Sequence, residues 1–215
     1  LIKEQFMTYV VWSLCLLLSS LVFADEWELA RNDTQRQIQV YVSPQNNNSY
    51  HQFKAQTMVE QPLNTVLAVL SDINAWPQWL ARIKSVNVLK KEKDHSLVYV
   101  VYKLPYPFVE RDMVLYNRVQ HSKSGVVLIK AQAQANYLLP PEIIAKRVRL
   151  TNFSSTWRLT TLAKGGTLIE LWGQGDPEGF VPALVFNYNL PDEPLQSLKQ
   201  LRKMVLRPQY QKNKP

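Results

Sequence analysis

Hydrophobic and polar residues alternate through most of residues 83–175, which is the pattern of strands that bury one face. Two earlier stretches, residues 38–42 and 50–60, are further strand candidates, with the turn-rich sequence SPQNNNS between them. The later strand-like segments are IKSVNVLKKEK, SLVYVVYKL, VERDMVLYNRV, GVVLIKAQAQA, RVRLTNFSSTWRLTTL and TLIELWGQG. The pattern therefore predicts two strands, a helical break and then about six antiparallel strands.

Helical spacing occurs in two places. In residues 63–73, LNTVLAVLSDI, apolar residues recur at intervals of three and four after Pro62, which a first helical turn tolerates. The C-terminal segment has one apolar face, formed by Leu195, Leu198, Leu201 and Val205. An antiparallel sheet of this size cannot bury its concave face alone, so we expect the C-terminal helix to cover it. The predicted fold is α+β, a curved sheet wrapped around a helix, and such a wrap readily leaves a cavity.

The N-terminal residues carry a different signal. Residues 10–23, VVWSLCLLLSSLVF, form an apolar run that is too short for a comfortable membrane span. It ends in Val22, Phe23 and Ala24, the small or branched pattern that signal peptidase prefers, and acidic residues follow. We therefore expect a signal peptide over residues 1–24 and one domain over residues 25–215, in the periplasm or secreted. The alternative is an uncleaved N-terminal anchor.

The cysteine content and the net charge limit the chemistry and the binding partners that we expect. Cys15 is the only cysteine, and because Leu14 precedes it, we interpret it as part of the signal core and not as a lipidation site. The predicted domain then has neither a disulfide nor thiol chemistry. Its net charge of +8 suggests an anionic partner, and for a secreted protein a membrane surface is favoured over nucleic acid. We expect a monomer.

Motifs for metal or nucleophilic chemistry are not found in the sequence. The three histidines, His51, His95 and His121, are isolated and lack the spacing of a metal site. The glycines of residues 163–167, AKGGT, predict a hairpin turn and not a phosphate loop. We therefore expect no metal site. An acid–base enzyme that uses one buried carboxylate stays open, since such a site needs no motif.

Aromatic residues are the most informative side chains. As candidates for lining a ligand cavity we take Trp76, Trp79, Tyr102, Trp157, Trp172, Phe180 and Phe186. Flat apolar surfaces with indole or hydroxyl donors suit a cavity that orients a hydrophobic ligand. For each residue taken singly, core packing is the simpler interpretation.

From about residue 27 to residue 207 the chain resembles the START lipid-transfer domain family. The similar segments occur in family order, and they are WELARNDTQRQIQVYV, PLNTVLAVLSDINAWPQW, LPYPFVERDMV, VRLTNFSSTWRLTTL, DPEGFVPALVFN and the C-terminal Leu-Lys-Arg helix. The resemblance implies a helix-grip fold with a tunnel for one hydrophobic ligand, and neither a cofactor nor a metal. It also implies that the C-terminal helix and a loop between central strands form the lid.

The resemblance also points to Asn117. In several sterol-binding members an acid–Arg pair contacts the polar end of the ligand, and that arginine lies six residues after the arginine of the RD motif. Here this position is Asn117, which departs from the sterol-binding pattern but can still form a hydrogen bond with a polar group.

The RD motif itself, Arg111 and Asp112, lies at the start of a predicted strand. Neighbours in a strand face opposite ways, so the two side chains cannot both line a tunnel. One interpretation is a structural salt bridge that fixes the start of the strand, because a buried ion needs a partner. The other is that Arg111 contacts a ligand headgroup, since a guanidinium offers a fork of donors to phosphate or carboxylate.

The C-terminal cations are candidates for docking on anionic headgroups, and they are Lys199, Arg202, Lys203 and Arg207. A solvated helix face is the alternative. For the whole protein we expect a non-enzymatic lipid-binding or lipid-transfer function in the bacterial envelope. The alternative is a cyclase-like enzyme of the same fold, which would need an inward ionisable pair such as Glu170 with Arg111 or Asp112. A purely structural envelope protein is a third interpretation.

Overall fold

A computed structural model describes residues 27–140 and 147–211, so the predicted signal peptide lies outside the described residues. Within them, ten strands form one sheet in the order β1-β2-β3-β10-β9-β7-β6-β5-β4, and β8 pairs with β6. The strands are β1 (Glu28–Asp33), β2 (Ile38–Gln45), β3 (Asn48–Val59), β4 (Ile83–Lys91), β5 (His95–Tyr102), β6 (Arg111–His121), β7 (Val127–Ala133), β8 (Val148–Arg149), β9 (Phe153–Thr161) and β10 (Thr167–Gly175). All pairs are antiparallel except β6 with β8.

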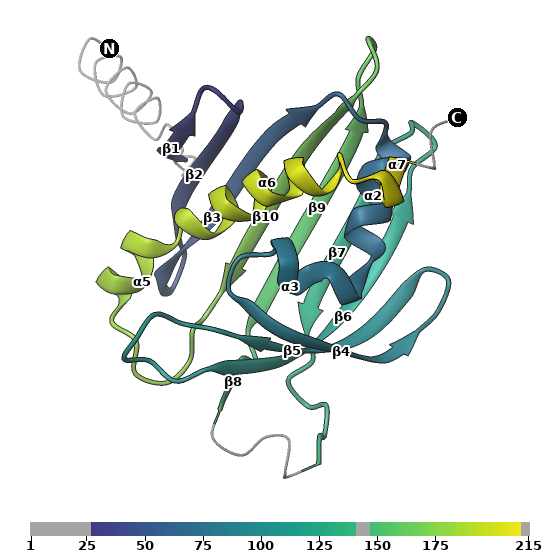
Figure 1. Ribbon diagram of the computed structural model, residues 1–215. Helices are drawn as coiled ribbons and strands as arrows, with labels where there is room; N and C mark the ends of the chain where they lie inside the picture. Colours follow the sequence, from purple (N-terminus) through teal and green to yellow (C-terminus); the bar gives the residue numbers. More distant parts are fainter. Residues whose placement is uncertain (1–26, 141–146, 212–215) are drawn as a thin grey trace, which may run out of the picture.

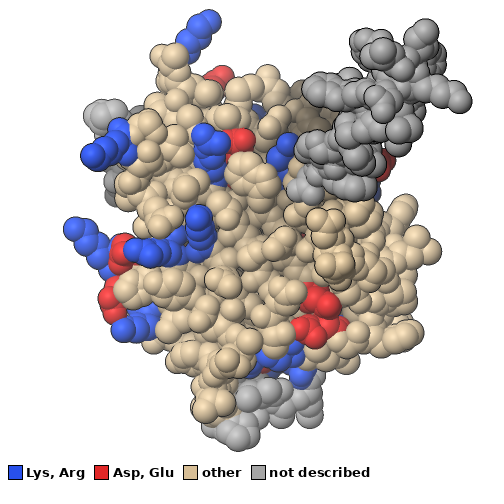
Figure 2. Space-filling view, turned by 180° about the vertical axis from the view of Figure 1, so that it is seen from behind, with Lys and Arg blue, Asp and Glu red and all other residues tan. Residues whose placement is uncertain are grey.

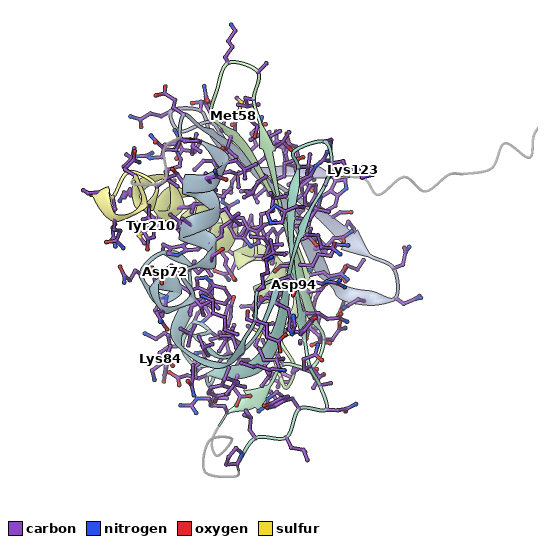
Figure 3. The ribbon with its side chains drawn as sticks, turned by 90° about the vertical axis from the view of Figure 1, so that its right-hand side faces the viewer. Met58, Asp72, Lys84, Asp94, Lys123 and Tyr210 are labelled. Carbon is purple, nitrogen blue, oxygen red and sulfur yellow. The ribbon has the colours of Figure 1, made fainter. Side chains whose placement is uncertain are left out.

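Helices cover one face of this sheet. They are α2 (Leu63–Ser71), a 3-10 turn (Ile73–Ala75), α3 (Trp76–Trp79), α5 (Ala183–Asn189), α6 (Asp192–Met204) and α7 (Pro208–Gln211). Figure 1 shows α6 lying across the sheet, with α3 on the same side. Seen from the side, the helices form one layer and the sheet the other (Figure 3). Among the described residues, no helix has both the length and the apolar character needed to cross a membrane.

The core lies between α6 and the concave face of the sheet. Leu198 and Leu201 of α6 are fully buried in the same cluster as Ile38 and Val40 of β2. Burial of each such side chain contributes roughly 1.5–3 kcal/mol. This packing confirms the predicted apolar face of the helix and the α+β class. At the far end, the Tyr210 hydroxyl of α7 donates a hydrogen bond of 2.7 Å to Asp72, and both residues lie on the helical side in Figure 3.

The predicted hairpin at residues 163–167 is confirmed, because the turn between β9 and β10 falls there. Its glycines Gly165 and Gly166 both have positive φ, 82° and 85°, a region that glycine enters at little cost. A Cβ on Gly166 would also lie 2.5 Å from the carbonyl oxygen of Val59, so a side chain there would clash with the neighbouring backbone.

Three details differ from the expectation. The strand β1 was not predicted, because its sequence ELARND lacks clear alternation and its residues are exposed or half-buried. Helix α2 ends at Ser71, before the expected residue 73, and the segment WPQW forms a further short helix, α3, with Pro77 in its first turn. The C-terminal helical region comprises α5, α6 and α7, and Leu190 and Pro191 separate α5 from α6.

Candidate functional site

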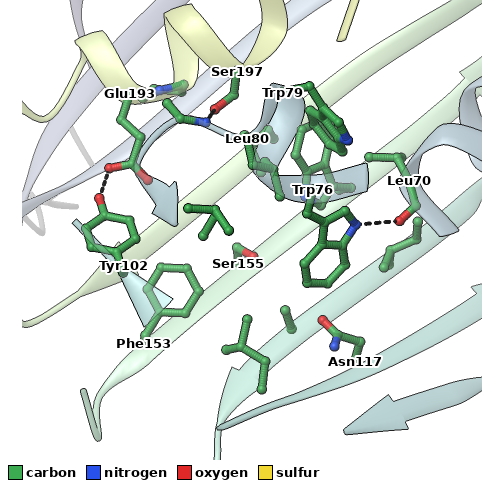
Figure 4. A pocket seen from close by; sticks show the side chains of 18 of the residues that line it. Leu70, Trp76, Trp79, Leu80, Tyr102, Asn117, Phe153, Ser155, Glu193 and Ser197 are labelled. Carbon is green, nitrogen blue, oxygen red and sulfur yellow. Dashed lines mark hydrogen bonds between the residues drawn. The ribbon is translucent and has the colours of Figure 1, made fainter. Parts of the chain in front are cut away.

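An apolar cavity of about 100 Å³ lies between the sheet and helices α3 and α6. The alternation of two central strands builds its floor: Met113, Leu115 and Asn117 of β6 face it, as do Phe153, Ser155 and Trp157 of β9. Helix α3 contributes Trp76 and Trp79 to the walls, and α6 contributes Glu193, Pro194 and Ser197. Figure 4 shows these side chains converging on one space.

Five of the predicted lining residues border this cavity, and they are Trp76, Trp79, Tyr102, Asn117 and Trp157. The Trp76 indole donates a hydrogen bond of 3.0 Å to the carbonyl of Leu70, which fixes its ring at the cavity wall (Figure 4). The rings of Trp79 and Trp157 meet edge to face, with centroids 5.9 Å apart. Asn117 lies at the end of the pocket opposite Glu193 and donates to the Ser96 hydroxyl at 3.4 Å.

Two predicted lining residues lie elsewhere. Trp172 falls between Leu171 and Gly173 on β10, and because Leu171 faces the cavity, strand alternation points Trp172 to the outer face of the sheet. Phe180 precedes α5 and is 89% exposed. A third residue, Phe186, borders two smaller hollows next to the main cavity and packs against Tyr50, with ring centroids 5.1 Å apart.

Arg111 does not pair with Asp112. It is 2% exposed, and its guanidinium donates hydrogen bonds to the backbone carbonyls of Val109, Pro177 and Glu178 at 2.6 to 2.8 Å. Burial lowers the pKa of this guanidinium. Arg111 borders a hollow of about 50 Å³, yet its hydrogen bonds to carbonyls hold the chain segment that leads from β10 toward α5. These contacts match a structural role.

A structural salt bridge at the start of this strand was one of the two interpretations of the RD motif. Asp112 forms such a salt bridge, and its partner is Arg149. Its carboxylate accepts a hydrogen bond of 2.5 Å from Arg149 Nε and another of 3.0 Å from the Tyr99 hydroxyl. The side chain of Asp112 is fully buried, and Arg149 is 17% exposed. The pair joins β6 to the short parallel strand β8.

Three of the four predicted docking cations, two in α6 and one just after it, contact the protein itself. Lys199 lies 3.1 Å from the carboxylate of Asp33, and Arg202 donates to the hydroxyl of Thr57 at 3.1 Å. Arg207 donates to the Gln78 amide oxygen at 2.6 Å. Lys203 is exposed and forms no ion pair with another described residue. On the sheet face away from α6, Lys and Arg gather toward one side and are interspersed with acidic residues (Figure 2).

The residue that the sequence analysis missed is Glu193. It lies in the first turn of α6 and is the one carboxylate among the described residues that line the main cavity. The Tyr102 hydroxyl donates a hydrogen bond to its Oε2, and Arg82 Nε lies 3.8 Å from the same oxygen. Burial raises the pKa of the Glu193 carboxyl, although Tyr102 and Arg82 act in the opposite direction. Acidic residues are common in first helical turns, so the sequence offered no signal of this position.

The inward ionisable pair that a cyclase-like enzyme would need is not assembled from the expected residues. Glu170 alternates with Ile169 and Leu171, which point into the core, so its side chain lies on the outer face of β10. There its carboxylate is 3.7 Å from Arg158 Nε of the neighbouring strand. Glu170 therefore does not supply the inward member of the pair that was named as the discriminating feature of the cyclase-like alternative.

Comparison with known proteins agrees with this architecture. A START domain matches residues 16–208 of the chain. The chain is 25% identical over 179 residues to an uncharacterized protein of Pseudomonas aeruginosa, over 83% of this chain and 86% of that protein.

Solved structures show the same fold. A crystal structure of a STAR-related lipid transfer protein from Xanthomonas axonopodis (fragment 25–204) has a TM-score of 0.77 at 24% identity, covering 85% of this chain and 100% of that one. Human StAR-related lipid transfer protein 5 has a TM-score of 0.74 at 15% identity, covering 95% and 96%. The helix-grip architecture and the family match confirm the resemblance seen in the sequence, and the chain belongs to the START domain family.

Proposed function

We propose that this protein binds a single lipid in the cavity beneath α6 and that it carries or senses this lipid without changing it chemically. The observation that carries the proposal is the cavity itself, whose walls are almost entirely aromatic and aliphatic. Such walls replace the hydrocarbon interior of a bilayer, so a lipid can leave water without any reaction. Membership of the START family and the likeness to a lipid transfer protein fold support the proposal.

In this proposal the structure is that of a closed state. The main cavity, at about 100 Å³, is smaller than the roughly 300–1,000 Å³ of pockets that hold small-molecule ligands. Two smaller hollows, of about 50 and 30 Å³, adjoin it beside α5 and the chain between β5 and β6. A lipid would need these spaces to merge, which requires α5 and the start of α6 to move away from the sheet.

Contact with a membrane is the next step of the proposal. The surface around α5 carries unusually exposed hydrophobic side chains: Phe180, Leu184 and Tyr188 are 89%, 83% and 74% exposed, and Tyr106 between β5 and β6 is 97% exposed. The two segments face each other across the hollow lined by Pro105, Phe108 and Phe186 among others. Exposed apolar groups around a cavity entrance suit insertion between headgroups. The C-terminal cations then contribute less to membrane binding than these hydrophobic side chains, because several of the cations already contact the protein itself.

The compartment remains a proposal from the sequence. The apolar run of residues 10–23 favours the bacterial envelope, either as a soluble periplasmic or secreted protein or as an anchored one. Fractionation of cells that produce the full chain tests this directly. Recovery in the cytoplasm alone, at full length, would contradict it.

Lipid uptake can be tested with a matched pair of variants on strand β9. Ser155 borders the cavity, whereas its neighbour Ser154 faces the other side of the strand. Purified protein is incubated with vesicles of a bacterial lipid extract, separated from them, and its bound lipid is extracted and quantified. We expect the natural chain and Ser154→Phe to take up lipid, and Ser155→Phe to take up at least about ten-fold less, because the ring occupies the cavity. Uptake that is absent in all three proteins, or equal in all three, would overturn the proposal.

A further inference from the structure

A polar site lies inside the otherwise apolar cavity. Glu193 of α6 borders the main cavity and both smaller hollows, and Tyr102 of β5 borders the same three spaces. The hydrogen bond between them therefore lies where the three spaces meet. Any ligand that occupies more than one of these spaces must pass this point.

The carboxylate of Glu193 is only partly satisfied by the protein. The Tyr102 hydroxyl and Arg82 both approach Oε2, and Oε1 has no hydrogen-bond partner among the described residues. About a quarter of the side chain, 24%, stays accessible although helix, strand and loop surround it. Figure 4 shows the Tyr102 contact at one end of the pocket, opposite Asn117. A buried carboxylate is costly unless its oxygens accept hydrogen bonds, so Oε1 is a vacant acceptor at the meeting point.

Two other polar side chains along the cavity are engaged, whereas the buried Trp79 indole Nε1 has no hydrogen-bond partner among the described residues. Ser197 accepts a hydrogen bond of 3.0 Å from the backbone N–H of Ala81, and Asn117 contacts Ser96. Arg82 carries a positive charge near Oε2, but at 3.8 Å from it the guanidinium does not form a close bidentate pair. Glu193 is therefore the one charged acceptor among the described residues that line the main cavity, and its Oε1 is free to accept from a ligand.

We propose that Glu193, whose Oε2 is contacted by Tyr102 and Arg82, recognises the polar end of the bound lipid through a hydrogen-bond donor of the ligand, which is a hydroxyl or an ammonium group. The apolar part of such a ligand lies against the aromatic walls of the main cavity. A free fatty acid is disfavoured at neutral pH, because a second carboxyl group would lie beside that of Glu193 at short range. The inference rests on the proposed function and specifies the chemical class of the ligand.

Four probes with the same saturated chain test this class: hexadecanol, hexadecylamine, palmitic acid and methyl palmitate. Their binding to the purified full chain is measured at neutral pH by native mass spectrometry with titration. We expect hexadecanol and hexadecylamine to bind at least about ten-fold more tightly than methyl palmitate, because each can donate a hydrogen bond to a charged acceptor. We expect palmitic acid to bind most weakly of the four. In Glu193→Gln we expect this preference to fall to within about three-fold, and palmitic acid to gain affinity, because the amide offers a donor and no charge.

Two further variants serve as controls. Ser155→Ala alters the same cavity away from Glu193 and should keep the preference for donors. Tyr102→Phe removes the protein's own donor to Glu193 and frees Oε2 for the ligand, so it should increase the preference, opposite to Glu193→Gln, and an unchanged or smaller preference would count against recognition by Glu193. This variant also keeps the test valid if Glu193→Gln does not fold.

The outcomes separate the two proposals. If all four probes bind the natural chain equally, or if Glu193→Gln keeps the full preference, recognition by Glu193 is overturned while lipid binding stands. If no probe binds and vesicle lipid is not taken up either, the proposed function fails and the recognition site with it.

Discussion

The start of strand β6 and the first turn of α6 each place a buried charge beside the same small hollow, but the two charges differ in how fully the protein satisfies their hydrogen bonds. Arg111 donates to three backbone carbonyls. Glu193 shares one oxygen with Tyr102 and Arg82 and leaves the other without a partner among the described residues. A charge whose hydrogen bonds all go to the protein stabilises the fold, whereas a charge left partly unpaired in an apolar cavity is available to a ligand.

The largest effect is expected at Arg111. Arg111→Met leaves three carbonyl oxygens without their donor in a buried region, so the free energy of unfolding should fall by about 3 kcal/mol or more. Urea unfolding measures this loss. Arg36→Met is the control, because Arg36 forms an exposed pair with Asp33 and should cost less than about 1 kcal/mol. Equal losses in both variants would mean that the contacts of Arg111 are not structural.

The next effect concerns the other half of the RD motif. Asp112→Asn removes the charge that Arg149 contacts, and because Arg149 is partly exposed we expect a loss of about 2 kcal/mol in the free energy of unfolding. Glu110→Gln, in a more exposed pair with Lys84, should cost less than about 1 kcal/mol. A loss at Asp112 no larger than that at Glu110 would show that the pair between β6 and β8 contributes little.

The smallest effect on stability is expected at Glu193, and it depends on pH. Because burial raises the pKa of this carboxyl, the folded state holds its proton more tightly than the unfolded state. The free energy of unfolding of the natural chain should therefore fall, relative to Glu193→Gln, as pH rises from about 4.3 through the raised pKa. Urea unfolding at a series of pH values measures the difference, in which carboxyls common to both proteins cancel. A difference that stays constant over this range, or changes the other way, would contradict the raised pKa.

Much of the fold follows from local patterns in the sequence. Strand alternation correctly sends Met113 and Leu115 to one face of β6, and the spacing of Leu198 and Leu201 predicts the buried face of α6. Where alternation was not applied, as at Trp172, the predicted place in the cavity wall was wrong. The aromatic character of Trp172 suggested that it lines the cavity. Its neighbour Leu171 faces the cavity, however, so strand alternation sends Trp172 to the opposite face of the sheet.

The partners of the buried charges could not be predicted, because they are distant in sequence. Arg111 contacts carbonyls 66 and 67 residues away, and such acceptors exist on every residue, so no side-chain type reveals them. Tyr102 and Glu193 are 91 residues apart, and each resembles an ordinary strand aromatic or helix N-terminal acid. Only the curvature of the sheet under α6 brings them together.

The central claim is that the cavity beneath α6 holds one lipid. Native mass spectrometry of the full chain as purified, followed by extraction and identification of the released molecule, tests it most directly. We predict one hydrophobic adduct per chain, lost in Ser155→Phe and kept in Ser154→Phe, whose polar end carries a hydroxyl or an amine. A protein that is reproducibly empty as purified, and that stays empty after exposure to lipid vesicles, would contradict the claim.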